Sequence, residues 1–390
     1  MKNYKIILLL SYISIASASA VILNPALPHI SSELNLANGQ VEWIVSIFLV
    51  GYVVGQLIYG PIARRFGSVS TLRIGLVINL IGIIVCIFAG IHLSFELLLL
   101  GRLITALGSS VGLVCTFIIL NHSVEPSRAK TALSFASISF ALSVTLAIMI
   151  GGFVNYYSHW NYCFYVLLAH GVAMYLFTYL YQNETPSISK INVGNIFSGY
   201  INALSSPKLL IFAFIIGVMS TFSYCYTTAA PFITQQLFDF NSAELGTYNA
   251  MTIVGIIAGS FGAAKIINSY DNVLVLKIAI ATLLVSFMII ASMAYFDIIT
   301  PIIFFGIITL MYFITSFIYP AASHIASNAL ADDKASASAM MNFINMAVAV
   351  LSVSIMGYIS LDYIYSFVVI CLVVSVTAFF FLFLKGFAKE

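Results

Sequence analysis

The sequence predicts an all-α integral membrane protein with twelve transmembrane helices in two six-helix bundles. Of the 390 residues, 62% are hydrophobic and only 7% are charged, whereas about a quarter of the residues of a soluble domain are charged. The apolar runs are continuous and about 20 residues long, the length that an α-helix needs to cross a bilayer. Because lipid cannot satisfy backbone amides, runs of this length must form helices that satisfy their own.

Windows of about 19 residues separate the twelve apolar runs. The expected spans are 6–27, 41–60, 71–91, 95–119, 131–154, 161–181, 209–233, 245–267, 273–295, 298–322, 335–359 and 362–384. The first run imitates a secretory signal, but it continues through Leu23, so we expect it to be retained as a helix. The expected division is an N-terminal six-helix bundle at 1–181, a polar cytoplasmic linker at 182–208, and a C-terminal six-helix bundle at 209–390.

Lysine and arginine residues fall on one side of the membrane in this assignment. They precede the first span, flank the connections after spans two, four, six, eight and ten, and follow the last span. The opposite connections contain none; these are 28–40, 92–94, 155–160, 234–244, 296–297 and 360–361. The positive-inside rule therefore predicts that both termini and the linker are cytoplasmic.

A weak internal repeat relates the two halves. At an offset of 204 residues, four positions match in one register: Gly51 with Gly255, Gly55 with Gly259, Phe66 with Tyr270, and Arg73 with Lys277. The matches fall on the corresponding helix of each half, so they favour duplication of a six-helix unit.

Several short motifs carry a family resemblance. They are NPALP at 24–28, GQLIYGP at 55–61, GPIARRFG at 60–67, Gly101-Arg102 with Gly108, Gly151-Gly152, Trp160 to Phe164, Ala230 to Phe232, and ASASAMMNF at 335–343. As a set they resemble the Bcr/CflA drug-resistance branch of the major facilitator superfamily, over nearly the whole chain. The resemblance implies two parallel six-helix halves. It also implies a monomeric exporter in the inner membrane that moves drugs, or an endogenous metabolite such as a siderophore, in exchange for protons.

Arg102 is the only arginine or lysine well inside a predicted span. A guanidinium there must be paired or hydrated. It either clamps helices together through carbonyls that Pro25 and Pro28 free in the first span, or it contacts substrate or controls a protonatable carboxylate, for which Glu42 is the nearest plausible anionic partner.

Other polar or aromatic side chains repeat at helical spacing and are candidates for binding substrate. They are Ser17 and Asn24, Tyr52 and Gln56, Tyr224 and Thr228, Asn342 and Asn345, and the aromatic pair Tyr312 and Tyr319, with Phe222 and Phe232 opposite. Such residues also join neighbouring helices without any role in binding, and both interpretations stay open.

The acidic residues all lie in predicted loops or at span ends, and Val21 stands where some members of the resembled family carry a first-helix acid. Glu42, at the outer end of span two, and His170, in span six, are the proton-coupling candidates. The alternatives are a solvated interfacial Glu42 and a buried neutral His170. An importer or facilitator of a small polar nutrient is therefore the alternative function.

The loop after span two is the expected gate. Its residues are Gly60, Pro61, Arg64, Arg65 and Gly67. We expect the helix to break at Gly60-Pro61 and the chain to turn at Phe66-Gly67. The family's aspartate is replaced by Arg64, which suggests a charge-swapped latch onto Asp332 or Asp333 before span eleven. The alternative is that Arg64 only sets the topology.

The sequence contains no HExxH or phosphate-loop motif, its GxSxG match at 108–112 lies within the expected span 95–119, and its five cysteines are scattered. We expect no enzyme activity, no cofactor, no metal and no nucleic-acid partner. The expected partners are a small-molecule substrate, protons and the bilayer.

Overall fold

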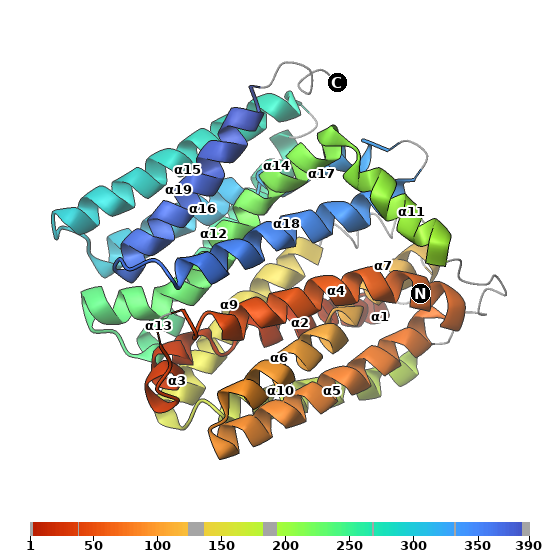
Figure 1. The fold of residues 1–390 in the computed structure, drawn as a ribbon, viewed down its shortest axis with the longest axis horizontal. Helices are drawn as coiled ribbons and strands as arrows, with labels where there is room; N and C mark the ends of the chain where they lie inside the picture. The colour runs from red at the N-terminus through yellow and green to blue at the C-terminus, as the bar shows by residue number, and fades with distance from the viewer. Residues whose placement is uncertain are drawn as a thin grey trace. The chain divides into compact units, whose positions relative to one another are not determined.

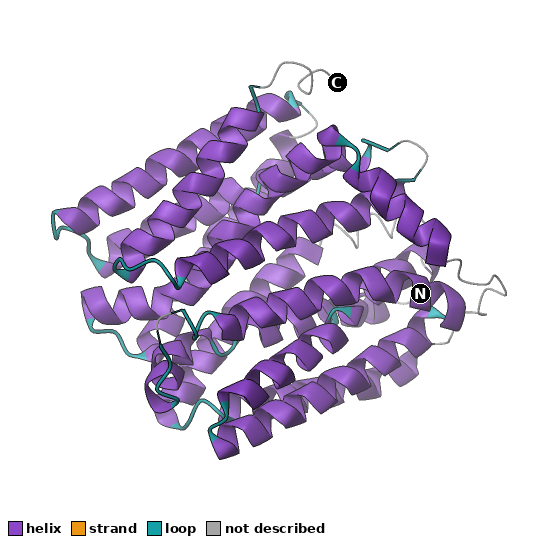
Figure 2. Cartoon of the chain, in the orientation of Figure 1, coloured by secondary structure: helices purple, strands orange, loops and turns teal. Residues whose placement is uncertain are grey.

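The computed structural model describes residues 3–37, 39–123, 136–181, 193–266, 269–330 and 333–383, and every regular element in these ranges is helical (Figures 1 and 2). Within them, 11 helices or runs of helices are long and apolar enough to cross a membrane. A further helix, α9 (Ala136–Tyr157), carries the shorter apolar stretch Leu142–Tyr157. The expected all-α class is confirmed, and each of the twelve predicted spans overlaps a helix or a run of helices.

The first half contains α1 (Asn3–Ser11), α2 (Ile13–Val21), η1 (Asn24–Ala26), α3 (Leu27–Glu33), α4 (Trp43–Phe66), α5 (Ser68–His92), α6 (Phe95–Ser109), α7 (Val111–Ser123), α9, α10 (Tyr162–Phe177) and η2 (Thr178–Leu180). The second half contains α11 (Val193–Leu204), α12 (Pro207–Phe238), α13 (Ser242–Asn249), α14 (Thr252–Ile266), α15 (Asn272–Tyr295), α16 (Pro301–Thr315), α17 (Ile318–Ser327), α18 (Lys334–Met356) and α19 (Tyr363–Phe381).

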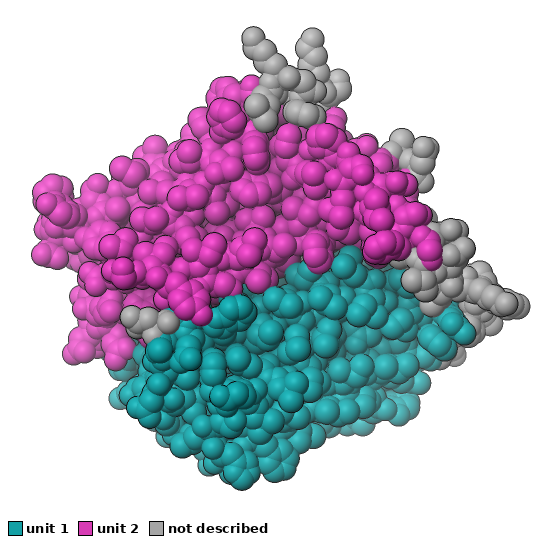
Figure 3. Space-filling view, in the orientation of Figure 1, with its two compact units in different colours: residues 1–191, 241–246 teal, residues 192–240, 247–390 magenta. Residues whose placement is uncertain are grey.

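The chain forms two compact units (Figure 3). Unit 1 comprises residues 1–191 and 241–246, and unit 2 comprises 192–240 and 247–390. Helix α11 lies in the stretch that the sequence assigned to the polar cytoplasmic linker, and it belongs to unit 2. The expected boundaries at 181 and 208 stay a prediction.

The first span is not one continuous helix. Helix α2 ends at Val21, and the chain continues through the 3₁₀ turn η1 into α3. Pro25 and Pro28 have no N–H, so neither can donate the helical bond to the residue four positions earlier. The interruption leaves the last carbonyls of α2 without their ordinary helical partners.

The expected helix break at Gly60-Pro61 is wrong. Helix α4 runs through Pro61 to Phe66, and α5 begins at Ser68, so the turn between them is Gly67 alone. Gly67 has φ 85° and ψ 147°, a conformation that residues with a Cβ rarely adopt. The helix ends at Gly67 because a residue without a Cβ can adopt the backbone conformation that reverses the chain direction. A proline within a long helix removes one backbone hydrogen bond, and α4 continues past Pro61.

Close packing of α5 against α6 depends on glycines of both helices. A Cβ on Gly82 would lie 2.3 Å from the backbone nitrogen of Thr105. A Cβ on Gly108 would lie 2.2 Å from the backbone nitrogen of Asn79. Small residues let helix backbones approach closely in this way within a membrane.

Packing supports the internal repeat. In unit 1, Gly51 and Gly55 of α4 lie against the carbonyls of Leu103 and Leu107 of α6. In unit 2, the matching Gly255 and Gly259 of α14 lie against the carbonyls of Thr309 and Phe313 of α16. The helix pairs correspond in order within each half, so the repeated glycines occupy repeated contacts.

Candidate functional site

Arg102 joins three helices of unit 1 through backbone carbonyls. It is 1% exposed. Its Nε donates to the carbonyl of Ile44 at 3.1 Å, Nη2 donates to that of Ala20 at 3.1 Å, and Nη1 donates to that of Ser19. The guanidinium also lies 4.3 Å from the centre of the Phe48 ring. A planar fork of donors suits such a convergence of acceptors better than an ammonium.

The carbonyls of the first span that Arg102 binds are not those expected. Proline rings at 25 and 28 would free the carbonyls of Val21 and Asn24, four residues earlier. The guanidinium instead binds Ser19 and Ala20, in the last turn of α2, where terminal carbonyls need partners and the helix dipole favours a cation. This geometry is that of a clamp between helices.

Glu42 is fully buried, at 0% exposure, so the interpretation of it as a solvated interfacial residue is wrong. It immediately precedes α4, and its backbone carbonyl accepts bonds from the N–H groups of Val45 and Ser46. The carbonyl of Ile44, two residues on, is one of the three that Arg102 holds. The start of α4 is therefore fixed, and it carries a carboxyl group removed from water.

The other unit 1 candidates differ in how their polar atoms are used. Ser17 is buried and donates to the carbonyl of Ile13 on its own helix at 3.2 Å. Asn24 is 2% exposed, and neither atom of its amide has a hydrogen-bond partner among the residues that the structure describes. Tyr52 is buried and Gln56 is half-buried.

His170 of α10 is partly buried and hydrogen-bonds to Ser14 of α2, with 3.0 Å between Nε2 and Oγ. The Ser14 hydroxyl also donates to the carbonyl of Ser11 at 2.6 Å. Because a hydroxyl has one proton, Ser14 must accept from His170, which assigns the neutral ring its proton at Nε2.

Two candidates of unit 2 bond within or between its helices. The hydroxyl of Thr228 donates to the carbonyl of Tyr224 on the same helix at 2.7 Å. Asn345 of α18 is 3% exposed and accepts from the hydroxyl of Ser220 of α12. Asn342, one turn earlier, is half-buried. The amide of Asn345 thus connects two helices.

Some of the aromatic candidates lie together in unit 2. Phe222 and Tyr312 are in contact, with ring centres 4.9 Å apart, and Tyr226 packs against both rings. Tyr319 has no part in this group and is 37% exposed. Phe232 stacks instead on Tyr363, with centres 4.1 Å apart.

The residues of the expected gate differ in their secondary structure and exposure. Gly60 and Pro61 are within α4, and Arg64 and Arg65 at its end are exposed. Asp333 caps α18, since its Oδ1 accepts from the backbone N–H of Ser336 at 3.0 Å. Asp332 lies outside the described residues. The latch between Arg64 and these acids stays a prediction.

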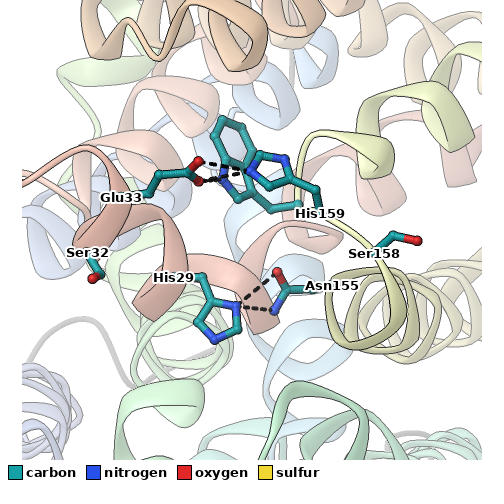
Figure 4. A pocket seen from close by; sticks show the side chains of 7 residues that line it. His29, Ser32, Glu33, Asn155, Ser158 and His159 are labelled. Carbon is teal, nitrogen blue, oxygen red and sulfur yellow. Dashed lines mark hydrogen bonds and ion pairs between the residues drawn. The ribbon is translucent and has the colours of Figure 1, made fainter.

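Unit 1 contains a polar pocket that was not predicted from the sequence. It measures about 260 Å³ and is lined by His29, Ser32, Glu33, Asn155, Ser158, His159 and Trp160 (Figure 4). These residues come from α3, from the end of α9, and from the connection to α10. The pocket joins two connections that both fall on the side predicted to be extracellular.

Glu33 is the centre of the pocket's hydrogen bonds. Its carboxylate accepts from the indole N–H of Trp160 and lies 3.0 Å from Nε2 of His159. Nδ1 of His159 accepts from the backbone N–H of Asn161 at 3.2 Å, so the neutral ring donates to Glu33 through Nε2. His29 lies 3.1 Å from the amide nitrogen of Asn155. His29 and Glu33, four residues apart on one short helix, are the sequence signal for this cluster.

Comparison with known proteins defines the class. Residues 8–353 match the model of the Major Facilitator Superfamily, and the chain belongs to this superfamily. An uncharacterized transporter of Rickettsia felis is 24% identical over 255 residues, which are 65% of this chain and 62% of the relative. The chain is thus matched to less than two thirds of that relative's length.

Two further comparisons concern a multidrug protein and the fold. Multidrug resistance protein MdtL of Citrobacter koseri is 26% identical over 260 residues, which are 63% of this chain and 64% of MdtL. The crystal structure of a D-xylose-proton symporter superposes with a TM-score of 0.77 over 97% of both chains at 10% identity. The expected superfamily is confirmed, and proteins named for multidrug resistance are among the relatives.

Proposed function

We propose that this protein is a secondary-active exporter of small organic molecules that works by alternating access in exchange for protons, in the cytoplasmic membrane. Membership of the superfamily and the likeness to MdtL support export. The observation that carries proton exchange is the complete burial of Glu42. The sequence seemed to lack a carboxyl group inside the membrane, and the buried carboxyl group at the start of α4 is our candidate for that role.

Proton coupling requires a carboxyl group whose exposure to water changes between conformations, and we propose this role for the buried Glu42. A charged carboxylate withdrawn from water is disfavoured by several kcal/mol unless charges or hydrogen bonds compensate. In this proposal Glu42 carries a proton while it is buried and releases the proton in a conformation that exposes it to water. Substrate release and proton uptake are coupled when both depend on that same change.

Within this proposal, Arg102 positions helices and Asn24 contacts substrate. The guanidinium is already committed to three carbonyls. The amide of Asn24, by contrast, is buried beside the interruption of the first span and has unused donors and acceptors among the described residues. A substrate with complementary hydrogen-bonding groups would satisfy them.

Inverted membrane vesicles from cells that produce the protein test the proposal. An imposed pH gradient, acidic inside, should drive candidate organic compounds inward, and Glu42→Gln should abolish this gradient-driven uptake while leaving downhill exchange of substrate. Glu96→Gln is the matched control, because Glu96 is exposed at the start of α6. Uptake that ignores the gradient in both orientations would favour the facilitator instead. Normal gradient-driven uptake by Glu42→Gln would remove Glu42 from the mechanism.

A further inference from the structure

We propose that α11 is an interfacial membrane helix, which lies in the surface of the predicted cytoplasmic leaflet and anchors the start of α18 to the bilayer. This helix belongs to unit 2 and lies beside the beginning of α18 (Figure 1). It occupies part of the stretch 182–208, which the sequence predicts to be a cytoplasmic linker. The proposed partner is lipid.

One face of α11 is apolar and exposed. Phe197 is 65% exposed, Ile201 48% and Leu204 44%. The intervals of four and three residues place all three side chains on the same face of the helix. Large apolar side chains on one face of a helix, at this degree of exposure, are typical of helices that lie in a membrane surface.

The opposite face of α11 is packed against protein. Gly199 and Ala203 are both buried, and each follows an exposed apolar position by two residues, which is about 200° around the helix. A Cβ on Gly199 would lie 2.5 Å from the hydroxyl of Ser336 and 2.7 Å from Oδ2 of Asp333, at the start of α18. The orientation of α11 about its axis is therefore set by its contact with α18.

Polar residues occupy a third face. Ser198, Asn202 and Ser205 are exposed and lie between the apolar face and the face that contacts α18. No acidic residue occurs from 193 to 208, and Lys208 follows the helix. A surface without acidic residues is not repelled by the anionic headgroups of a cytoplasmic leaflet.

Continuity with the transmembrane surface identifies the bilayer as the partner. Helix α11 ends at Leu204 and the membrane-spanning α12 begins at Pro207. The exposed apolar surface of α12 starts at Leu210, 36% exposed, six residues after Leu204. The apolar face of α11 thus lies within a few residues of the lipid-facing surface, at the level where α12 enters the membrane.

Spin labels on single introduced cysteines test this placement in the full protein reconstituted into lipid bilayers. All five native cysteines are buried, so a label directs itself to an exposed introduced one. Phe197→Cys and Ile201→Cys report on the apolar face, and Asn202→Cys is the matched control on the polar face. Collision with oxygen, which concentrates in lipid, is compared with collision with a water-soluble nickel chelate.

Labels at 197 and 201 should collide several-fold more with oxygen than with the chelate, and the label at 202 should show the reverse preference. Equal chelate access at 197, 201 and 202 would overturn the proposal, because it would place the apolar face in water. Labels at 197 and 201 that are immobilised and shielded from both reagents would also overturn it, since a protein surface would then cover the face.

Discussion

Replacing Arg102 separates its two possible roles, because a helix clamp and a substrate contact predict opposite results. Arg102→Lys keeps the charge but replaces a fixed fork of donors with one compact ammonium. At least two of the three bonds to Ser19, Ala20 and Ile44 are then lost. Hydrogen bonds from charged donors contribute about 1.5–3 kcal/mol each, so the loss is about 3–6 kcal/mol. In a unit of this size that lowers the melting temperature on the order of 10 °C.

A thiol-reactive dye measures this change, since all five cysteines are buried and become reactive on unfolding. Arg64→Lys is the matched control because Arg64 is exposed, and it should melt with the parent protein. The same variants are assayed for the KM of transport with several compounds. If Arg102→Lys melts normally but changes KM for one compound and not another, the clamp interpretation fails and Arg102 contacts substrate.

Two further predictions concern packing and gating. Gly82→Ala should destabilise the protein by about 1–3 kcal/mol, because its Cβ would lie 2.3 Å from the backbone of Thr105. Gly306→Ala, with nothing within 4 Å of its Cβ, should be neutral or stabilise by up to about 1 kcal/mol in the same dye assay; equal melting of the two variants would contradict the packing argument. If the latch exists, Arg64→Asp should reduce transport, and adding Asp332→Arg and Asp333→Arg should restore it. Asp333→Asn keeps a capping side chain on α18 and controls for loss of the cap. Normal transport by Arg64→Asp alone would exclude the latch.

Helix positions were predictable because each membrane-spanning helix corresponds to a long apolar run in the sequence. The predicted span 273–295 corresponds to α15, Asn272–Tyr295, almost residue for residue. The error at Pro61 has a physical reason: a proline suggests a break, but the glycine at 67 provides the conformation that the reversal needs. Helix α11 was missed because its 12 residues are shorter than the window that finds transmembrane helices.

The site was less predictable, because burial and partners depend on tertiary structure. The sequence marks Arg102 as a residue that needs partners, but it does not say which carbonyls lie within reach. Glu42 at the end of a span reads as interfacial, and only the packing around it shows that it is buried. The pocket around Glu33 required α3 and the connection before α10 to meet, and these are 126 residues apart in the chain.

The contacts of Arg102 suggest how Glu42 could take the place of the acid that the resembled family carries in its first helix. That acid would fall at Val21, and Val21 is here a buried apolar residue at the end of α2. Arg102 binds the carbonyls of the two preceding residues, Ser19 and Ala20, and with the same guanidinium it binds Ile44, two residues beyond Glu42. The end of α2 and the start of α4 are therefore held together around one cation. A carboxyl group moved from the first helix to the second stays in the same neighbourhood, and we infer that the two positions are alternative places for one proton site.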